Sequence, residues 1–213
     1  MKRTVYCGLI GEKDIGSRQL VAGWVQTKRD MGGVIFIDLR DREGTLQVVF
    51  NAANMPAEEF SVVEGLKNQS VIYAEGNIRL RDAETVNPKI ATGTVELMAG
   101  HVELVSSSET LPFSLDDGVS VREDLRLKYR FLDIRRPQMI NNLRYRHTVQ
   151  RVVEKYLDDE GFISVETPML CKSTPEGARD YLVPSRVHPG TFYALPQSPQ
   201  IFKQLLMVGG VDK

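Results

Sequence analysis

The chain has 213 residues, of which 42% are hydrophobic and 26% are charged, which is ordinary for a globular protein of one or two domains. Its formal net charge of −1 excludes nucleic-acid binding through overall charge but leaves room for a local basic patch. The two cysteines are not spaced as metal ligands, so we predict no metal site. The N-terminus lacks the apolar run of a signal peptide, and no stretch reaches the roughly 20 apolar residues of a membrane span. We therefore predict a cytosolic protein with no membrane partner.

The first half of the chain alternates apolar and polar residues as β-strands do. Turns at 32–33 and 42–44 separate the first three predicted strands. The strands are predicted over 19–26, 34–40, 45–50, 70–81 and 94–106, with a helix over 56–68 between the third and the fourth. Three strands, a helix and two strands are the order of a five-stranded OB-fold barrel, an all-β fold that we therefore predict over residues 1–108.

A linker is predicted over residues 109–136, after the barrel. Its second part, 122–136, carries six basic and three acidic residues, a local charge of +3 that the total for the chain hides. Helical spacing within this part predicts a short helix over 123–131.

The third region, 137–213, is predicted to begin with a long helix that runs to about residue 160, where Gly161 ends it. Strands are predicted over 162–167, closed by Pro168, and over 191–195. One long helix, a few short strands and a terminal helix cannot close a sizeable sheet. We therefore expect the start of a larger α+β domain, truncated in this chain.

The last predicted helix carries the first candidate site. Ser198 is predicted as its N-cap and Pro199 as its first residue. Gln200 and Lys203 are three residues apart and share one face, next to the apolar Phe202. Two long polar side chains beside apolar ones indicate the lining of a pocket, although an amphipathic surface helix has the same spacing.

Five segments, taken together and in order, resemble the aspartyl-tRNA synthetases of bacteria, a class II family. They are residues 33–44, 127–136, 161–168, 174–181 and 197–203. The resemblance implies, in the same order, an anticodon-binding barrel, a hinge, a dimer-forming helix and strand, a mobile loop over the amino acid, and an aspartate-binding helix. It covers essentially the whole chain, and five motifs in sequence are far more specific than one.

The resemblance implies an aspartate–tRNA ligase. Such an enzyme joins L-aspartate to ATP, giving aspartyl-adenylate and pyrophosphate, and then passes the aspartyl group to the 3′ end of tRNA(Asp). The family acts as a homodimer with ATP and Mg²⁺. The signatures that hold ATP and magnesium lie beyond Lys213, so no catalytic residue is assigned in this chain. The sequence leaves open whether tRNA(Asn) is a second partner.

Candidate anticodon-binding residues lie on the predicted barrel. By the period of 2 in strands, Phe36 and Asp38 share one face, opposite an all-aliphatic face that should be the core. An aromatic ring on an open face can stack on a splayed base, whereas a buried Phe36 would be ordinary barrel core. The resemblance assigns Arg29, Phe36 and Gln47 to the anticodon, with Glu96 as a candidate for its first base. Lys28 is a further candidate; it lies where relatives commonly show a run of arginines and would make a weaker phosphate or base contact than arginine.

Candidate aspartate-binding residues follow from the charges of the substrate. The side-chain carboxylate of aspartate needs a cation, and Lys203 is a compact one. Ser198, Gln200 and Glu176 can accept hydrogen bonds from its α-ammonium group. Glu176 lies between a proline and a glycine, in a segment whose composition permits closure over a ligand. The resemblance further assigns Gly161 and Pro168 to the motif of the dimer interface.

Two alternatives compete with this interpretation. An asparaginyl- or lysyl-tRNA synthetase would share the barrel and the first class II motif, but neither substrate side chain needs a cation such as Lys203. A stand-alone RNA-binding or regulatory module would keep the barrel without catalysis. Such a module would have no use for an aspartate pocket that includes Glu176 and Lys203.

Overall fold

The computed structural model describes residues 2–116, 118–174 and 179–213. The chain divides into two compact units, Met1–Pro112 and Phe113–Lys213, and the division falls inside the segment 109–136.

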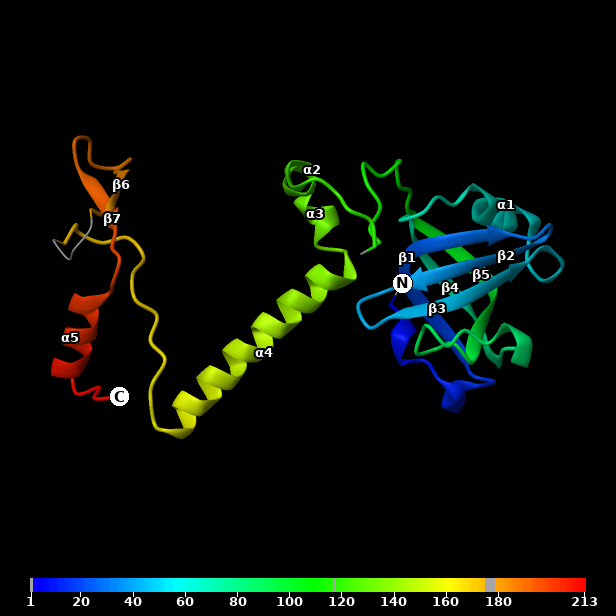
Figure 1. The fold of residues 1–213 in the computed structure, drawn as a ribbon, viewed down its shortest axis with the longest axis horizontal. Coiled ribbons are helices and arrows are strands. Elements are labelled where there is room, and N and C mark those ends of the chain that lie inside the picture. Colours follow the sequence, from blue (N-terminus) through cyan, green and yellow to red (C-terminus); the bar gives the residue numbers. More distant parts are fainter. Residues whose placement is uncertain (1, 117, 175–178) are drawn as a thin grey trace. The chain divides into compact units, whose positions relative to one another are not determined.

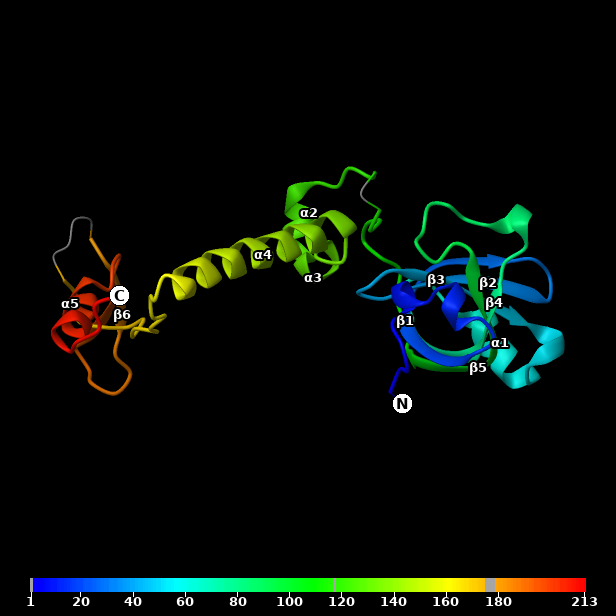
Figure 2. The ribbon, with the colours of Figure 1, turned by 90° about the horizontal axis from the view of Figure 1, so that it is seen from below.

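The first unit is a closed five-stranded barrel (Figures 1 and 2). Its strands are β1 (Arg18–Asp30), β2 (Val34–Arg40), β3 (Thr45–Asn51), β4 (Val71–Leu80) and β5 (Val95–Ser106). They follow one another around the barrel as β1-β2-β3-β5-β4, and only β3 and β5 pair in parallel. The predicted OB-fold barrel is therefore confirmed, and β1 extends beyond its predicted end.

Strand β2 shows why these residues close a barrel. Ile35, Ile37 and Leu39 are fully buried in the core, while Phe36 and Asp38 between them are partly exposed, as the alternation predicts. The turn before β2 places Gly32 and Gly33 at φ of +74° and +84°, a backbone region that glycine adopts without steric cost. The chain therefore reverses there and aligns β1 with β2.

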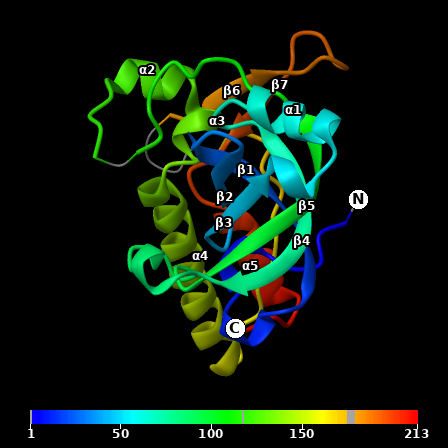
Figure 3. The same cartoon turned by 90° about the vertical axis from the view of Figure 1, so that its right-hand side faces the viewer.

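Helix α1 (Ala57–Gly65) packs on β5 and β3 and covers one end of the barrel (Figure 3). Its Phe60 and Val63, together with Leu66 just after it, are buried in the barrel core, so the helix predicted over 56–68 is amphipathic and packs on the barrel. Short 3₁₀ turns complete this unit: η1 (Cys7–Leu9), η2 (Glu12–Asp14), η3 (Ala52–Asn54) and η4 (Ala83–Thr85).

The second unit begins with two short helices rather than the single one predicted over 123–131. Helix α2 (Glu123–Lys128) and helix α3 (Arg130–Asp133) are separated by Tyr129, whose φ of −111° and ψ of 46° are not helical. Helix α4 (Pro137–Asp159) follows, with proline in its first turn as predicted. Gly161 has a φ of +82° just after α4, which confirms the predicted end of this helix.

The predicted strand over 162–167 is wrong, because no described strand runs beside it to complete a ladder. Instead, the N–H of Phe162 donates to the carbonyl of Leu157 near the end of α4, and the N–H of Ile163 donates to the carbonyl of Lys213. Strands β6 (Tyr181–Pro184) and β7 (Phe192–Leu195) instead form an antiparallel pair; β7 was predicted and β6 was not.

Helix α5 (Gln200–Val208) begins two residues after the predicted N-cap. Pro199 occupies the N-cap position and no side chain caps the helix, so the prediction for Ser198 is wrong. The hydroxyl of Ser198 lies one residue too early in the chain for that role. None of the described helices is long and apolar enough to cross a membrane.

Candidate functional site

Polar side chains and one aromatic ring, from all five strands and from Arg81 just after β4, lie together on one surface of the barrel. We call this set the open face: Arg29, Phe36, Asp38, Gln47, Arg79, Arg81 and Glu96. Strand register brings them together, because Phe36 is opposite Arg29, Asp38 is opposite Gln47, and Glu96 is opposite both Gln47 and Arg79. Residues distant in sequence therefore form one continuous surface.

Gln47 is at the centre of the open face and is 3% exposed. Its Nε2 donates to Glu96 Oε2 at 2.6 Å, and its Oε1 accepts from Arg29 Nη2 at 3.1 Å. A carboxylate only accepts and a guanidinium only donates, so the two partners fix which end of the amide faces which side. Gln47 is held in one orientation by its neighbours, with one N–H and one lone pair left for a ligand.

Glu96 is a buried carboxylate surrounded by arginines. Its Oε1 accepts from Arg79 Nε at 2.7 Å and is 2.6 Å from Arg79 Nη2, while its Oε2 lies 4.0 Å from Arg81 Nε. A buried charge is tolerated when it is paired and hydrogen-bonded, and both conditions hold here. Glu96 and Gln47 are therefore buried and paired, unlike ordinary exposed strand residues.

Arg81 is the least satisfied group of the open face. It is 9% exposed, and its Nε and Nη1 have no hydrogen-bond partner among the residues that the structure describes. Buried guanidinium N–H groups without acceptors carry a free-energy cost. Arg79 and Arg81 were not among the predicted site residues, although their period-2 spacing at the end of a predicted strand was a usable signal.

Arg29 and Phe36 form the accessible edge of the open face. The side chain of Arg29 is half exposed and lies 3.2 Å from Asp38 Oδ1. The partly exposed Phe36 belongs to the same surface, since it pairs with Arg29 across strands β1 and β2. An aromatic ring beside a guanidinium offers stacking and charge to a nucleotide together.

Lys28 does not join the open face. It precedes Arg29 in β1, so its side chain projects to the other side of the strand. Its Nζ donates to the carbonyl of Glu64 at 2.5 Å and lies 3.5 Å from that of Val63, both at the last turn of α1. Carbonyls at a helix C-terminus attract a cation, so the structure uses Lys28 to hold α1 against the barrel.

The residues predicted to bind aspartate are only partly grouped by the structure. Gln200 and Lys203 lie one turn apart on α5 and are exposed. Ser198 lines a pocket of about 190 Å³ just before α5, together with Cys171, Lys172, Thr174, Pro196, Pro199, Ile201 and Phe202. Glu176 lies outside the described residues. Gly161 ends α4, and Pro168 is exposed in the segment after it.

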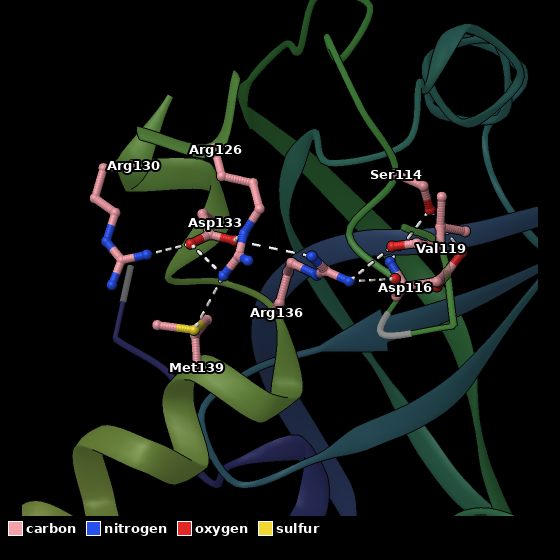
Figure 4. A network of polar contacts seen from close by, with 8 residues as sticks. All are labelled: Ser114, Asp116, Val119, Arg126, Arg130, Asp133, Arg136 and Met139. Carbon is pink, nitrogen blue, oxygen red and sulfur yellow. Dashed lines mark hydrogen bonds and ion pairs between the residues drawn. The ribbon is translucent and has the colours of Figure 1, made fainter. Parts of the chain in front are cut away.

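The basic segment before α4 is organised by one buried carboxylate, Asp133 (Figure 4). Arg126 donates to its two oxygens at 2.8 and 3.3 Å, Arg130 donates to Oδ2, and Arg136 Nη1 is 3.9 Å from Oδ1. Hydrogen bonds from Arg126, opposed by burial, hold the pKa of Asp133 below its usual value.

Arg136 links this cluster to the preceding turn. Its Nη2 donates to the carbonyls of Asp116 at 3.1 Å and Val119 at 3.0 Å (Figure 4). One carboxylate and two carbonyls therefore orient the residue that immediately precedes α4. The sequence predicted the positive charge of this segment but not the acidic residue that arranges it.

Comparison with known proteins gives two matches along the chain. Residues 20–105 match a family described as an OB-fold nucleic acid binding domain, and residues 122–213 match the class II tRNA synthetases for D, K and N. Aspartate–tRNA ligases of Geobacillus kaustophilus and of Staphylococcus aureus strain Newman are 55% and 54% identical over all 213 residues. The chain spans 36% of the length of each of these relatives.

Solved structures show the same fold at low sequence identity. An asparaginyl-tRNA synthetase from Pyrococcus horikoshii complexed with asparaginyl-adenylate superposes with a TM-score of 0.82 at 23% identity, over 98% of this chain and 46% of that one. A putative aspartyl-tRNA synthetase from Leishmania major Friedlin gives 0.82 at 22% identity, over 99% of this chain and 42% of that one.

Proposed function

Because this chain belongs to the aspartate–tRNA ligase family, we propose that it supplies anticodon recognition and part of the aspartate site to an enzyme that charges tRNA(Asp). The barrel, residues 1–108, binds the anticodon; residues 109–136 are the hinge; and residues 137–213 begin the catalytic domain. The observation that carries the proposal is the open face, where a fixed amide, a buried carboxylate and an accessible aromatic ring lie on the barrel of a synthetase family.

Four members of the open face have a defined task in this proposal. Phe36 stacks on a base, Arg29 contributes charge and hydrogen bonds, and Gln47 presents its remaining donor and acceptor to a base edge. Glu96 is nearly saturated by protein donors, so it acts on the first anticodon base through its remaining lone pair. Lys28 serves the barrel rather than the RNA, because its ammonium is engaged by α1.

The aspartate site is proposed around α5. Lys203 binds the side-chain carboxylate of the substrate, while Ser198, Gln200 and Glu176 accept hydrogen bonds from its ammonium group. The family reaction also needs ATP, and Mg²⁺ supplies charge neutralisation when bound. The described residues do not fit that ion, since no three His, Cys, Asp or Glu side chains among them are placed to hold a metal.

We further propose that the whole enzyme is a cytosolic homodimer, with Gly161 and Pro168 in the dimer motif. The exposed apolar side chains of α4 are compatible with a covering partner; they include Leu143, Val149, Val152, Val153, Tyr156 and Leu157. A second subunit is one such partner.

The barrel's task is tested with an RNA stem-loop that carries the aspartate anticodon GUC. Fluorescence anisotropy of this labelled RNA with the 213-residue chain should show binding that weakens with added salt. A stem-loop with the same stem and a scrambled loop should bind less tightly. Equal binding of both RNAs would contradict anticodon recognition.

The enzymatic task is tested with a chimera, in which this chain is completed by the rest of the Geobacillus kaustophilus relative. We expect the chimera to catalyse aspartate-dependent pyrophosphate exchange and to charge tRNA(Asp). The 213-residue chain alone should give no exchange, since positioning of ATP carries much of the rate. Exchange by that chain alone would show that its own residues suffice.

A further inference from the structure

The oxygen Oε2 of Glu96 has one donor at hydrogen-bond distance and a second donor close by. Gln47 Nε2 donates a hydrogen bond to this oxygen at 2.6 Å, and Arg81 Nε lies 4.0 Å from the same oxygen. Arg81 is buried, and neither its Nε nor its Nη1 is hydrogen-bonded to any residue that the structure describes. A donor without an acceptor therefore lies about 1 Å beyond the normal length of a charged hydrogen bond to this oxygen.

The amide of Gln47 is fully oriented before any ligand arrives. Arg29 holds one end and Glu96 holds the other. A base that hydrogen-bonds to the Gln47 amide and pulls it outward lengthens the hydrogen bond from Gln47 Nε2 to Glu96 Oε2. The buried oxygen Oε2 then loses its donor. An uncompensated carboxylate oxygen at a buried position is costly, so the movement needs a replacement donor.

We propose that Arg81 is this replacement: when an RNA base engages Gln47, Glu96 Oε2 exchanges the amide of Gln47 for the guanidinium of Arg81. The inference rests on the proposed anticodon function of the open face. Arg81 acts as a positioning residue, because it compensates Glu96 and does not itself read a base.

The other arginines of the open face are not placed to donate a replacement hydrogen bond to Glu96 Oε2. Arg79 already places both Nε and Nη2 on the opposite oxygen, Oε1. Arg29 lies at the far end of the Gln47 amide, where it is engaged with Asp38 as well. Arg81 alone combines proximity to Oε2 with unused donors, among the residues described.

A double-mutant cycle tests the exchange. The 213-residue chain, Arg81→Met, Gln47→Ala and the double variant are titrated with the GUC stem-loop by fluorescence anisotropy at one salt concentration. We expect Arg81→Met to weaken binding about tenfold when Gln47 is present, the effect of one hydrogen bond to a charged group. In the Gln47→Ala background Oε2 has no amide to release, so Arg81→Met should change the affinity by less than about twofold.

Two variants serve as controls. Arg18→Met removes an exposed arginine that pairs with Glu75 outside the open face, so it reports the loss of one positive charge alone. Arg81→Lys keeps a cation near Glu96 and should restore most of the affinity lost in Arg81→Met. Equal losses for Arg81→Met in both Gln47 backgrounds would indicate a direct RNA contact and would overturn the exchange.

A spectroscopic measurement remains decisive if Arg81→Met fails to fold. The ¹⁵N resonance of Arg81 Nε should shift when the stem-loop is added to the unmodified chain and stay unchanged in Gln47→Ala. A resonance that does not move with bound RNA would overturn the exchange while leaving anticodon binding intact. If the unmodified chain does not prefer the GUC loop, the proposed function itself fails and the exchange fails with it.

Discussion

The barrel buries its apolar residues and pairs its polar ones, whereas the second unit leaves many of both exposed. In β2 and β3 the inward residues are fully buried and the outward Gln47 is hydrogen-bonded at both ends. On α4, Val152 and Tyr156 are 63% and 64% exposed, and no residue of this helix is buried. The barrel thus holds a buried core and a hydrogen-bonded polar surface, while in the second unit α4 has no buried residue.

This difference follows from how each unit satisfies its backbone. A closed barrel pairs every strand with two neighbours and leaves no edge. A helix satisfies its own backbone hydrogen bonds, so α4 forms without a layer against it. Stability and binding should therefore respond to substitution very differently in the two units.

Paired substitutions of core and surface should give the largest contrast. Ile37→Ala removes a fully buried side chain from the barrel and should lower the free energy of unfolding by about 2–5 kcal/mol. Val152→Ala on the exposed side of α4 should change it by no more than about 0.5 kcal/mol. Urea unfolding followed by the fluorescence of Trp24, the single tryptophan, measures the effect in the barrel, and circular dichroism at 222 nm follows the helices of the second unit. Similar losses would show that α4 is covered in solution.

Substitution of Lys203 should abolish aspartate binding by the chimera. Lys203→Met leaves the substrate carboxylate without its cation, a loss of at least about 2–5 kcal/mol, or roughly 30-fold or more in affinity. Lys203→Arg should also fail, because the guanidinium is larger and planar. Gln200→Ala should lose less, about 1.5–3 kcal/mol for one hydrogen bond to a charge.

Calorimetric titration of aspartate into each chimera measures these losses, and ATP binding serves as the control. Lys203→Met that binds aspartate within about threefold of the parent, a change of less than 1 kcal/mol, would remove α5 from the carboxylate site. The proposed site on α5 would then fail, whereas the hydrogen bond between Gln47 and Glu96 lies within the barrel and does not depend on that result.

Removal of the Phe36 ring should weaken RNA binding without weakening the barrel. Phe36→Leu should cost about 1–3 kcal/mol of binding free energy if a base stacks on the ring. Its melting temperature should stay close to that of the parent, because the ring is outside the core. Anisotropy with the GUC stem-loop and a thermal melt give the two readings. A large fall in melting temperature with unchanged affinity would place Phe36 in the core.

Acid should weaken the arginine cluster around Asp133 in the second unit. Since the folded-state pKa of Asp133 is lowered, its contribution to stability is complete above the ordinary carboxyl pKa and is lost as the pH falls through the folded value. Asp133→Asn should lack this acid-dependent loss and should already be less stable by about 1–3 kcal/mol at neutral pH, since it forfeits charged hydrogen bonds. Circular dichroism at 222 nm between about pH 5 and pH 2 follows the helices. An identical acid profile for both proteins would exclude Asp133 as the group responsible.

Local sequence determined the strands of the barrel, the length of α4 and the end of α4 at Gly161. Alternation with period 2 and helical spacing are properties of neighbouring residues, so they can be read without knowing the partner of each segment. The outward position of Phe36 follows from the same rule.

Contacts between residues that are distant in sequence were decided only by the tertiary structure. The parallel pairing of β3 with β5 places Glu96 against Gln47 across 49 residues of chain, and it buries two residues that look like exposed strand positions. The fold also brings the carbonyl of Glu64 in α1 to Lys28 across 36 residues of chain, whereas Arg29 contacts Gln47 on the open face. The segment 162–167 has the composition of a strand, but a strand exists only where a second one completes its hydrogen bonds.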